Sequence, residues 1–343
     1  MTKVQGPSVY ASIARSATFG AWLSVASDTG SVVANVWRFS RAAVEWCGTP
    51  EPFFGVATRR GDHRAPGVAR LKDWSLRIWG SRGSVPVSGA HTQRHGGATT
   101  CIEIDLGDAR IIIDAGSGLA DLGRVAVGNP KPTLLLMSHL HWDHVLGFPH
   151  FAPLYTPGWT LDIRGVPRDG ITVLDALHSI SKPPLFPVDL RVAAAAQVST
   201  ENLPSSGTTV FHGAEIAWMP VAHPGGCTAF WFQLGGQKII FTGDLELRQT
   251  DLSALHSFAQ NADLLISDAQ YTEQEYLRYT GWGHSTNLDA AALALATGAK
   301  RLLLTHHDPR RTDDAIDSMV AEARQVFAYT EAARDGLIVS GSF

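Results

Sequence analysis

The feature that most constrains this 343-residue chain is the motif His-x-His-x-Asp-His at residues 139–144, which directly follows a largely apolar run at residues 133–137. The apolar run predicts a buried β-strand with the motif at its end. His139 and His141 are two residues apart, so in an extended chain both imidazoles point to the same side. Three imidazoles and a carboxylate this close together predict a metal site, and one such loop can supply ligands to two neighbouring ions.

The ligand types of this motif indicate a hydrolytic metal centre more than a structural one. Imidazole binds zinc, iron or copper, and an added carboxylate with room for water suits hydrolysis. A structural zinc site more often contains cysteine pairs, whereas Cys47, Cys101 and Cys227 are far apart in the sequence. The simpler alternative is a polar loop in which histidines happen to gather, but four ligand-type residues at this spacing form a demanding pattern.

The motif resembles that of the metallo-β-lactamase superfamily of hydrolases, and later segments supply the missing ligands in the order expected for that family. The resemblance implies two metal ions and seven ligands. These are His139, His141 and His223 for the first ion, Asp143, His144 and His306 for the second, and Asp244 as the bridge. His307 competes with His306, but adjacent residues of a strand face opposite sides, so only one of the two is expected to reach the metal.

The strand and helix patterns predict an α/β fold with a catalytic domain at residues 71–343. Strands are expected at residues 76–79, 101–105, 110–114, 133–137, 161–164, 215–219, 229–234, 238–241, 263–267 and 301–304, and helices at 253–260 and 288–297. Two runs of strands with helices between and after them indicate two packed sheets flanked by helices. The family resemblance makes this a four-layer αββα metallo-β-lactamase sandwich.

Residues 1–70 differ from the rest of the chain, because small and polar residues alternate there with scattered aromatics and no sustained period emerges. We expect a poorly structured N-terminal extension outside the catalytic fold. A misassigned translation start is one explanation for it. A partner-binding or targeting arm is the functional alternative.

The net charge and the hydropathy of the chain limit the classes of binding partner that are expected. Residues 71–343 hold twenty Lys and Arg against twenty-eight Asp and Glu, a net charge of −8, which argues against long nucleic acid as a partner. No apolar run is long enough to cross a bilayer, and the N-terminus lacks the pattern of a secretory signal. A cytoplasmic protein that acts on a small phosphodiester or nucleotide, without a membrane partner, is therefore expected, and a homodimer is left open.

The segment Gly-Trp-Gly-His-Ser-Thr at residues 281–286 resembles a motif of ribonuclease Z and related phosphodiesterases. The resemblance implies that His284 contacts the scissile phosphate and assists protonation of the leaving group. Asp268 holds the position expected for an acid that orients this histidine, and Asp143 completes the implied catalytic residues. The alternatives are a loop histidine bonded to backbone and, for Asp268, a helix N-cap.

The matching segments extend from about residue 76 to residue 309 and look most similar to bacterial cyclic-nucleotide phosphodiesterase-like members of the superfamily. Two residues depart from the family pattern, since His95 stands where tyrosine is expected and Ala98 where asparagine is expected. Arg82 lies in a Gly-rich turn that could contact phosphate or simply reverse the chain. The aromatic and proline residues at 151–155 and 182–187, in a long insert between His144 and His223, could stack on a base, pack in the core or form a dimer contact.

The sequence thus predicts a dinuclear-metal hydrolase that cleaves phosphodiester bonds of small or cyclic nucleotides by means of a hydroxide bridging the two ions. Zn²⁺ is the first choice of metal, with Mn²⁺ or Fe²⁺ as alternatives. Three other functions stay open: tRNA 3′-processing endoribonuclease of the ribonuclease Z type, lactonase or thioesterase, and a metal-binding sensor module without turnover.

Overall fold

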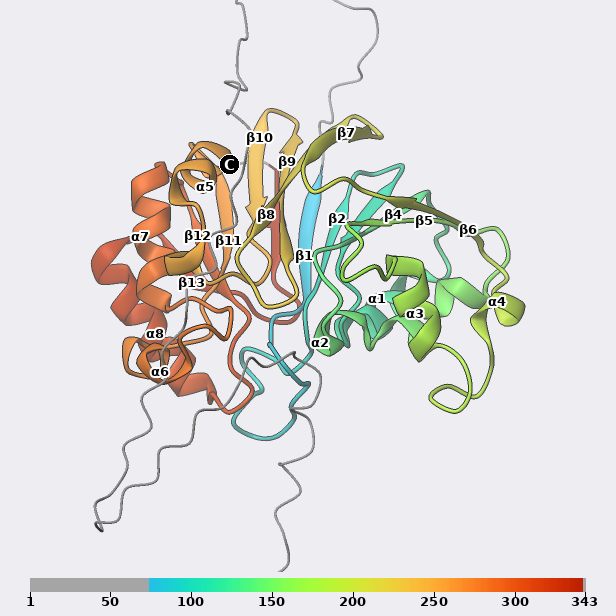
Figure 1. The fold of residues 1–343 in the computed structure, drawn as a ribbon, viewed down its shortest axis with the longest axis horizontal. Coiled ribbons are helices and arrows are strands. Elements are labelled where there is room, and N and C mark those ends of the chain that lie inside the picture. The colour runs from blue at the N-terminus through green and yellow to red at the C-terminus, as the bar shows by residue number, and fades with distance from the viewer. Residues whose placement is uncertain (1–73, 342–343) are drawn as a thin grey trace, which may run out of the picture. The chain divides into compact units, whose positions relative to one another are not determined.

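The computed structural model describes residues 74–341, which form two sheets packed face to face with helices on both outer sides (Figure 1). The predicted αββα sandwich is therefore confirmed. The predictions for residues 1–70 lie outside the described residues. In the part of the chain that the structure describes, no helix is both long enough and apolar enough to span a membrane.

The first sheet contains seven strands with parallel pairing from β3 to β6 and antiparallel pairing elsewhere. Their order is β14 (Ile338–Ser340), β1 (Ser75–Gly80), β2 (Cys101–Asp105), β3 (Arg110–Ile113), β4 (Thr133–Met137), β5 (Thr160–Gly165) and β6 (Gln197–Asn202).

The second sheet repeats this plan, with parallel pairing from β10 to β13 and antiparallel pairing from β7 to β10. Its order is β13 (Thr330–Ala332), β12 (Leu302–Thr305), β11 (Leu264–Asp268), β10 (Gln237–Phe241), β9 (Cys227–Leu234), β8 (Ala214–Val221) and β7 (Gly207–Phe211).

The helices follow the sheet to which they are joined in sequence (Figure 1). With the first sheet lie α1 (Gly118–Ala126), α2 (Trp142–Val145), α3 (Val173–Ile180) and α4 (Leu190–Ala193). With the second lie α5 (Leu252–Ala259), α6 (Glu273–Tyr279), α7 (Asn287–Thr297) and α8 (Asp313–Val326). Thr286 begins α7 through a capping box with Asp289, in which each side chain bonds the backbone N–H of the other residue.

Apolar side chains fill three layers, one between the sheets and one under each set of helices. Ile78, Phe230, Phe232 and Phe241 belong to the central layer. Most central strands are covered on both faces, and this is why β4 and β11 carry continuous apolar runs instead of an alternating pattern.

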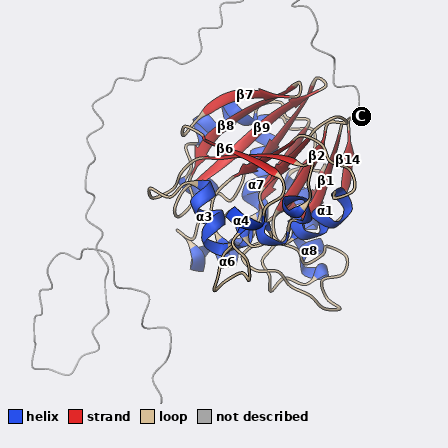
Figure 2. Ribbon diagram, turned by 90° about the vertical axis from the view of Figure 1, so that its right-hand side faces the viewer, coloured by secondary structure: helices blue, strands red, loops and turns tan. Residues whose placement is uncertain are grey.

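Several strands end at the same edge of the fold. β8 and β10 are both antiparallel to β9 and therefore run in the same direction, which β11 and β12 share. Figure 2 shows the strands of both sheets side by side, with loops gathered at their lower ends near α6. The loops that follow β4, β8, β10, β11 and β12 carry the predicted site residues, so the topology brings them together.

We expect truncation of Phe232 to weaken the sandwich. Its side chain is fully buried between the sheets, so Phe232→Ala should lower the free energy of unfolding by about 3–5 kcal/mol. Exposed Val210 on β7 offers a control, because Val210→Ala should change stability by no more than about 0.5 kcal/mol. Urea unfolding followed by circular dichroism would measure both, and equal losses would contradict the assignment of the core.

Candidate metal centre

Three histidines from two loops form the first ligand group, His139, His141 and His223. One ring nitrogen from each lies within 4.8 Å of the others. His139 and His141 follow β4, and His223 follows β8 of the other sheet. Nε2 of His223 and Nδ1 of His141 face one another at 3.0 Å. The predicted set for the first ion is thus gathered at one place.

Two carboxylates and two histidines form the second group, Asp143, His144, Asp244 and His306. Nε2 of His306 lies 3.1 Å from Asp143 Oδ2 and 3.0 Å from Asp244 Oδ2. Asp244 Oδ2 is also 3.3 Å from His144 Nε2 and 3.6 Å from His139 Nε2. Asp244 therefore lies between the two groups, in the position expected of a bridging carboxylate.

His306, and not His307, lies in the cluster. The backbone of His306 adopts a positive φ of 58° directly after β12, and its ring stacks on that of His144. Nε2 of His307 instead donates to the carbonyl of Ala333 at 3.0 Å. A non-glycine residue in the left-handed region costs energy and is held there by its surroundings. This turn therefore places His306, and not His307, among the candidate ligands.

A buried carboxylate that we did not predict as a site residue orients the motif loop. Asp114 follows β3 and is fully buried, with a positive φ of 62°. Its Oδ2 bonds Nδ1 of His144 at 2.8 Å and accepts from Ser138 Oγ at 2.7 Å, while its Oδ1 accepts from Ser138 N at 2.7 Å. A carboxylate on Nδ1 fixes the imidazole so that Nε2 points into the centre.

A glycine makes room for His223. The carbonyl of Gly283 bonds His223 Nδ1 at 2.8 Å and leaves Nε2 free to face the cluster. Gly283 has a φ of +90°, and a Cβ there would come within 2.3 Å of His223 Nδ1. Only glycine fits this backbone and this contact.

The two groups differ in charge. Burial lowers the pKa of His139 well below its usual value, lowers the pKa of His141 and lowers the pKa of His223 to about 4. These three imidazoles are therefore neutral at pH 7, and a neutral imidazole is the form that binds a metal ion.

In the second group the charges are paired. Burial alone would lower the pKa of His306, but the charge of Asp244 and a hydrogen bond with Asp143 outweigh it and raise the pKa to about 10. The pKa of His144 is raised in the same way, against its burial, chiefly by Asp244. Burial opposes ionisation of both carboxyls, yet the neighbouring histidines hold their pKa values below the usual range. The two buried carboxylates, Asp143 and Asp244, thus stay ionised through positively charged groups beside them.

The donor set fits divalent cations. Nε2 of His139, whose imidazole is neutral, is buried without a hydrogen-bond partner. Buried polar atoms are normally satisfied, so this nitrogen indicates a missing partner that accepts its lone pair. Neutral imidazoles beside two ionised carboxylates supply such a partner with both nitrogen and oxygen ligands.

His284 and Asp268 form a further pair at the edge of the cluster. Nδ1 of His284 bonds Asp268 Oδ2 at 2.7 Å, and its ring stacks on that of His306 with centroids 4.7 Å apart. One ring nitrogen of His284 lies within 4.8 Å of ligand atoms of His223 and Asp244. Asp268 ends β11 and is fully buried. The structure therefore brings together the histidine and the acid that we predicted as partners.

The first loop of the fold contacts the cluster through backbone, not through Arg82. The N–H of Ser84 donates to Asp143 Oδ2 at 2.6 Å. Arg82 is fully buried and donates to the carbonyls of Gly96, Asp308 and Arg311, so the prediction that it could contact phosphate is wrong. Its role is to tie the loop to the segment after His307.

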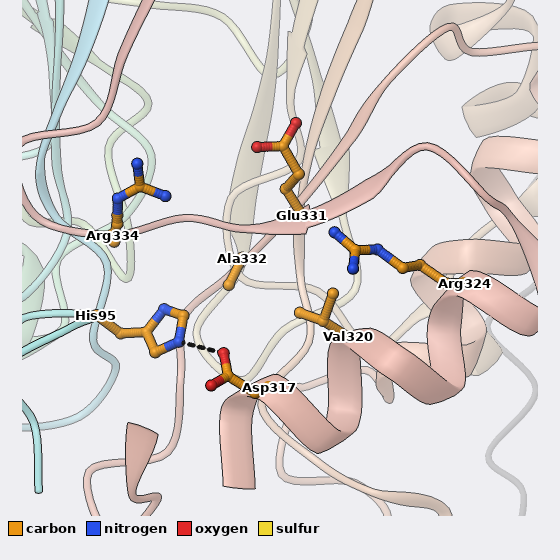
Figure 3. Close-up of a pocket in the computed structure, with 7 residues that line it drawn as sticks. All are labelled: His95, Asp317, Val320, Arg324, Glu331, Ala332 and Arg334. Atoms are coloured by element: carbon orange, nitrogen blue, oxygen red, sulfur yellow. Dashed lines mark hydrogen bonds and ion pairs between the residues drawn. The ribbon is translucent and has the colours of Figure 1, made fainter. Parts of the chain in front are cut away.

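His95, one of the two departures from the family pattern, lies outside the cluster. Its Nε2 bonds Asp317 Oδ1 on α8 at 2.9 Å, and its ring packs edge-on against His307. It lines a pocket of about 270 Å³ beside α8 and β13, shared with Arg324 and Arg334 (Figure 3). The substitution therefore changes the packing of the loop and not the ligand set.

The insert after the motif contributes to the core. Phe151 is 1% exposed and packs edge-on against Trp159 in the layer under the helices of the first sheet. It cannot stack on a base, and core packing is the correct interpretation for this aromatic residue.

The family follows from comparison with known proteins. The model of the beta-lactamase superfamily domain matches residues 109–307, more than half of the chain, and the fold and the His/Asp cluster agree with it. The chain belongs to the metallo-β-lactamase superfamily of hydrolases, whose members bind divalent metals.

Among curated proteins the chain is similar to ribonuclease Z. It is 39% identical over 104 residues to ribonuclease Z of Brevibacillus brevis, covering 29% of this chain and 31% of that protein. It is 43% identical over 101 residues to ribonuclease Z of Gemmatimonas aurantiaca, with the same shares. The chain thus matches about a third of the length of these relatives. The predicted likeness to the ribonuclease Z branch is confirmed over that part.

Solved structures share the fold. The metallo-β-lactamase fold protein YhfI from Bacillus subtilis superimposes with a TM-score of 0.62 at 24% identity, covering 78% of this chain and 99% of that one. A diphosphatase from the PhnP family gives 0.58 at 19% identity over 78% and 97%. Human tRNase Z, short form, gives 0.56 at 17% identity over 77% and 98%.

We expect Asp114→Asn to weaken metal binding by about 10- to 100-fold, because the bond that orients His144 loses its charge. Asp108 is 73% exposed and provides the control Asp108→Asn, which should bind as the wild type does. Competition with a chromophoric chelator for Zn²⁺ would measure the affinity. Unchanged affinity in Asp114→Asn would contradict the orienting role.

Acid should destabilise the metal-free protein partly through His307. Burial lowers the pKa of this histidine to about 3, while the unfolded chain takes up a proton near pH 6.5. The unfolded state then binds more protons below that pH, so the contribution of His307 to stability is lost as pH falls, by roughly 2 kcal/mol at pH 5. Unfolding of EDTA-treated His307→Gln should depend less steeply on pH between 7 and 5. Partly exposed His212 gives the control His212→Gln, and equal slopes would refute the assignment.

Proposed function

We propose that this protein is a phosphodiesterase that acts on small or cyclic nucleotides with two divalent ions, preferably Zn²⁺. The observation that carries the proposal is the His284–Asp268 pair, which is buried at the edge of the cluster, beside His306, and is not among the seven residues predicted as ligands. A hydrolase needs such a pair when the leaving group must be protonated, as an alkoxide must be.

The proposed ligands are the seven residues predicted from the sequence: His139, His141 and His223 for one ion, Asp143, His144 and His306 for the other, and Asp244 between them. When bound, the ions supply Lewis-acid chemistry, which lowers the pKa of water and neutralises charge on phosphoryl oxygens. Zinc suits this set because most of its members are imidazoles, and manganese or iron would satisfy the same ligand types.

His284 has the geometry of a general acid. Asp268 accepts from Nδ1, which leaves Nε2 to carry the proton that is delivered to the leaving oxygen. After transfer the ring is neutral, and its Nδ1–H still donates to Asp268. The carboxylate thus orients the ring and stabilises its charged form without being protonated itself. Asp143 acts as a ligand that the N–H of Ser84 holds in place.

A tRNA-processing function is the second candidate. The identity to two bacterial ribonucleases Z favours it, although the matches cover about a third of each relative. The net charge of −8 over residues 71–343 opposes binding of long RNA. A lactonase or thioesterase would use similar ions, but it would not require the His284–Asp268 pair.

We expect His284→Ala to lose turnover and keep its metal. Removal of a general acid should lower kcat for 2′,3′-cyclic nucleotides by about 10²- to 10⁴-fold. The loss should be much smaller for bis(p-nitrophenyl) phosphate, because p-nitrophenolate leaves readily without a proton. Elemental analysis should still find the wild-type metal content.

Two control variants accompany this experiment. Asp244→Ala should lose metal and activity together, because its carboxylate contacts residues of both groups. His212→Ala, which changes a residue before β8, at the opposite end of that strand from His223, should match the wild type. If His284→Ala cleaves alkyl-leaving diesters as fast as the wild type, its role is wrong. If only a lactone or thioester is turned over, the phosphodiesterase proposal fails.

A further inference from the structure

Three aromatic side chains extend outward from His284, and we call them the aromatic shelf: Tyr271, Tyr279 and Trp282. The ring of Tyr271 meets that of His284 edge-on at 5.7 Å. Tyr279 stacks on Tyr271 at 5.2 Å, and Trp282 follows at 5.1 Å from Tyr279. The shelf thus leads without interruption from the proposed general acid to the surface.

Trp282 sits on a loop that is fixed rather than loose. Both of its neighbours donate their N–H groups to the buried carboxylate of Glu246, Gly281 at 2.9 Å and Gly283 at 3.0 Å. Tyr276 donates its hydroxyl to the same carboxylate at 2.7 Å. Trp282 N also donates to the carbonyl of Tyr279 at 3.0 Å. The backbone that carries Trp282 is therefore held by hydrogen bonds on both sides, and the indole itself contacts the ring of Tyr279.

Despite this fixed position, Trp282 is 63% exposed. Tyr271 is buried, and Tyr279 is half-buried with the guanidinium of Arg310 over its ring. Trp282 is thus the member of the shelf with the most free surface. Apolar surface gains free energy when it is removed from water, and the exposed indole of Trp282 lacks this gain. A flat aromatic ligand that stacks on the indole would supply it.

The proposed proton transfer from His284 determines which part of a substrate lies against the aromatic shelf. His284 delivers its proton to the leaving oxygen, so the group bonded to that oxygen lies on the side of His284. In a cyclic nucleotide this group is the nucleoside itself. Its base then extends from the ribose toward the aromatic residues next to His284, of which Trp282 is only two positions away in the chain.

We propose that the aromatic shelf, with Trp282 as its open face, binds the base of the leaving nucleoside by stacking. The proposal rests on the phosphodiesterase function above and narrows its substrate to nucleotides. Stacking tolerates every base, because each presents a π-face, so the shelf selects nucleotides over alkyl diesters without selecting one base.

The test compares a substrate with and without its base. Adenosine 2′,3′-cyclic phosphate and the abasic methyl riboside 2,3-cyclic phosphate are hydrolysed by wild type, Trp282→Ala, Trp282→Phe and Leu277→Ala. Trp282→Ala should raise KM for the adenosine substrate by roughly 5- to 100-fold and leave the abasic substrate unchanged. Trp282→Phe should restore most of the loss. Leu277, 77% exposed on the same helix as Tyr279, is the control for removal of an apolar surface group.

A binding measurement separates this proposal from the function on which it rests. AMP should quench tryptophan fluorescence of the wild type, and the quenching should disappear in Trp282→Phe while calorimetry still detects AMP. Equal KM changes for both substrates, or no quenching by AMP, would overturn the shelf. If neither substrate is hydrolysed by wild type, the phosphodiesterase function fails, and the AMP experiment alone decides whether the shelf binds a base.

Discussion

The buried carboxylate of Asp114 is the contact on which the motif loop depends. It receives three hydrogen bonds, from the backbone and side chain of Ser138 and from His144. A carboxylate without exposure is tolerated only when its oxygens are satisfied, and here the donors come from the loop that it organises. The end of β3 therefore determines how the chain leaves β4. Its left-handed backbone, which costs of order 1–3 kcal/mol, is offset by these bonds.

The second sheet uses the same device twice. Asp268 accepts from the N–H groups of Leu245 and Gln270 and holds His284, while Glu246 holds the loop of Trp282. In each case a buried acid at or near a strand end fixes the loop beside it. Each sheet thus carries loops that buried acids hold in place, and the proposed ligands are side chains that meet between the loops of the two sheets. Neutral imidazoles lie on one side of Asp244 and charged pairs on the other, so the site is electrically divided before any ion enters.

Much of this could be predicted from sequence, because the information was local. The apolar runs predicted ten strands that the structure contains, and the spacing of the motif predicted a cluster into which His223, Asp244 and His306 indeed converge. What failed depended on tertiary contacts. The four strands that were not predicted lie at the edges of the sheets: β6 and β7 contain no buried residue, and β13 and β14 have three residues each, so their sequences show no apolar period. Nothing local distinguishes Arg82 in a buried network of carbonyls from an arginine that faces a ligand, and the same holds for Phe151 in the core.

The contacts between the loops of the two sheets join residues that are far apart in the chain. Asp143 meets His306 across 163 positions, and His141 meets His223 across 82. During synthesis on the ribosome the motif loop emerges long before its partners, and closing such long loops is slow. The second ligand group cannot exist until β12 has been made and has paired with β11. The nascent chain therefore lacks the complete set of candidate metal ligands. That set forms only when the two sheets have packed together.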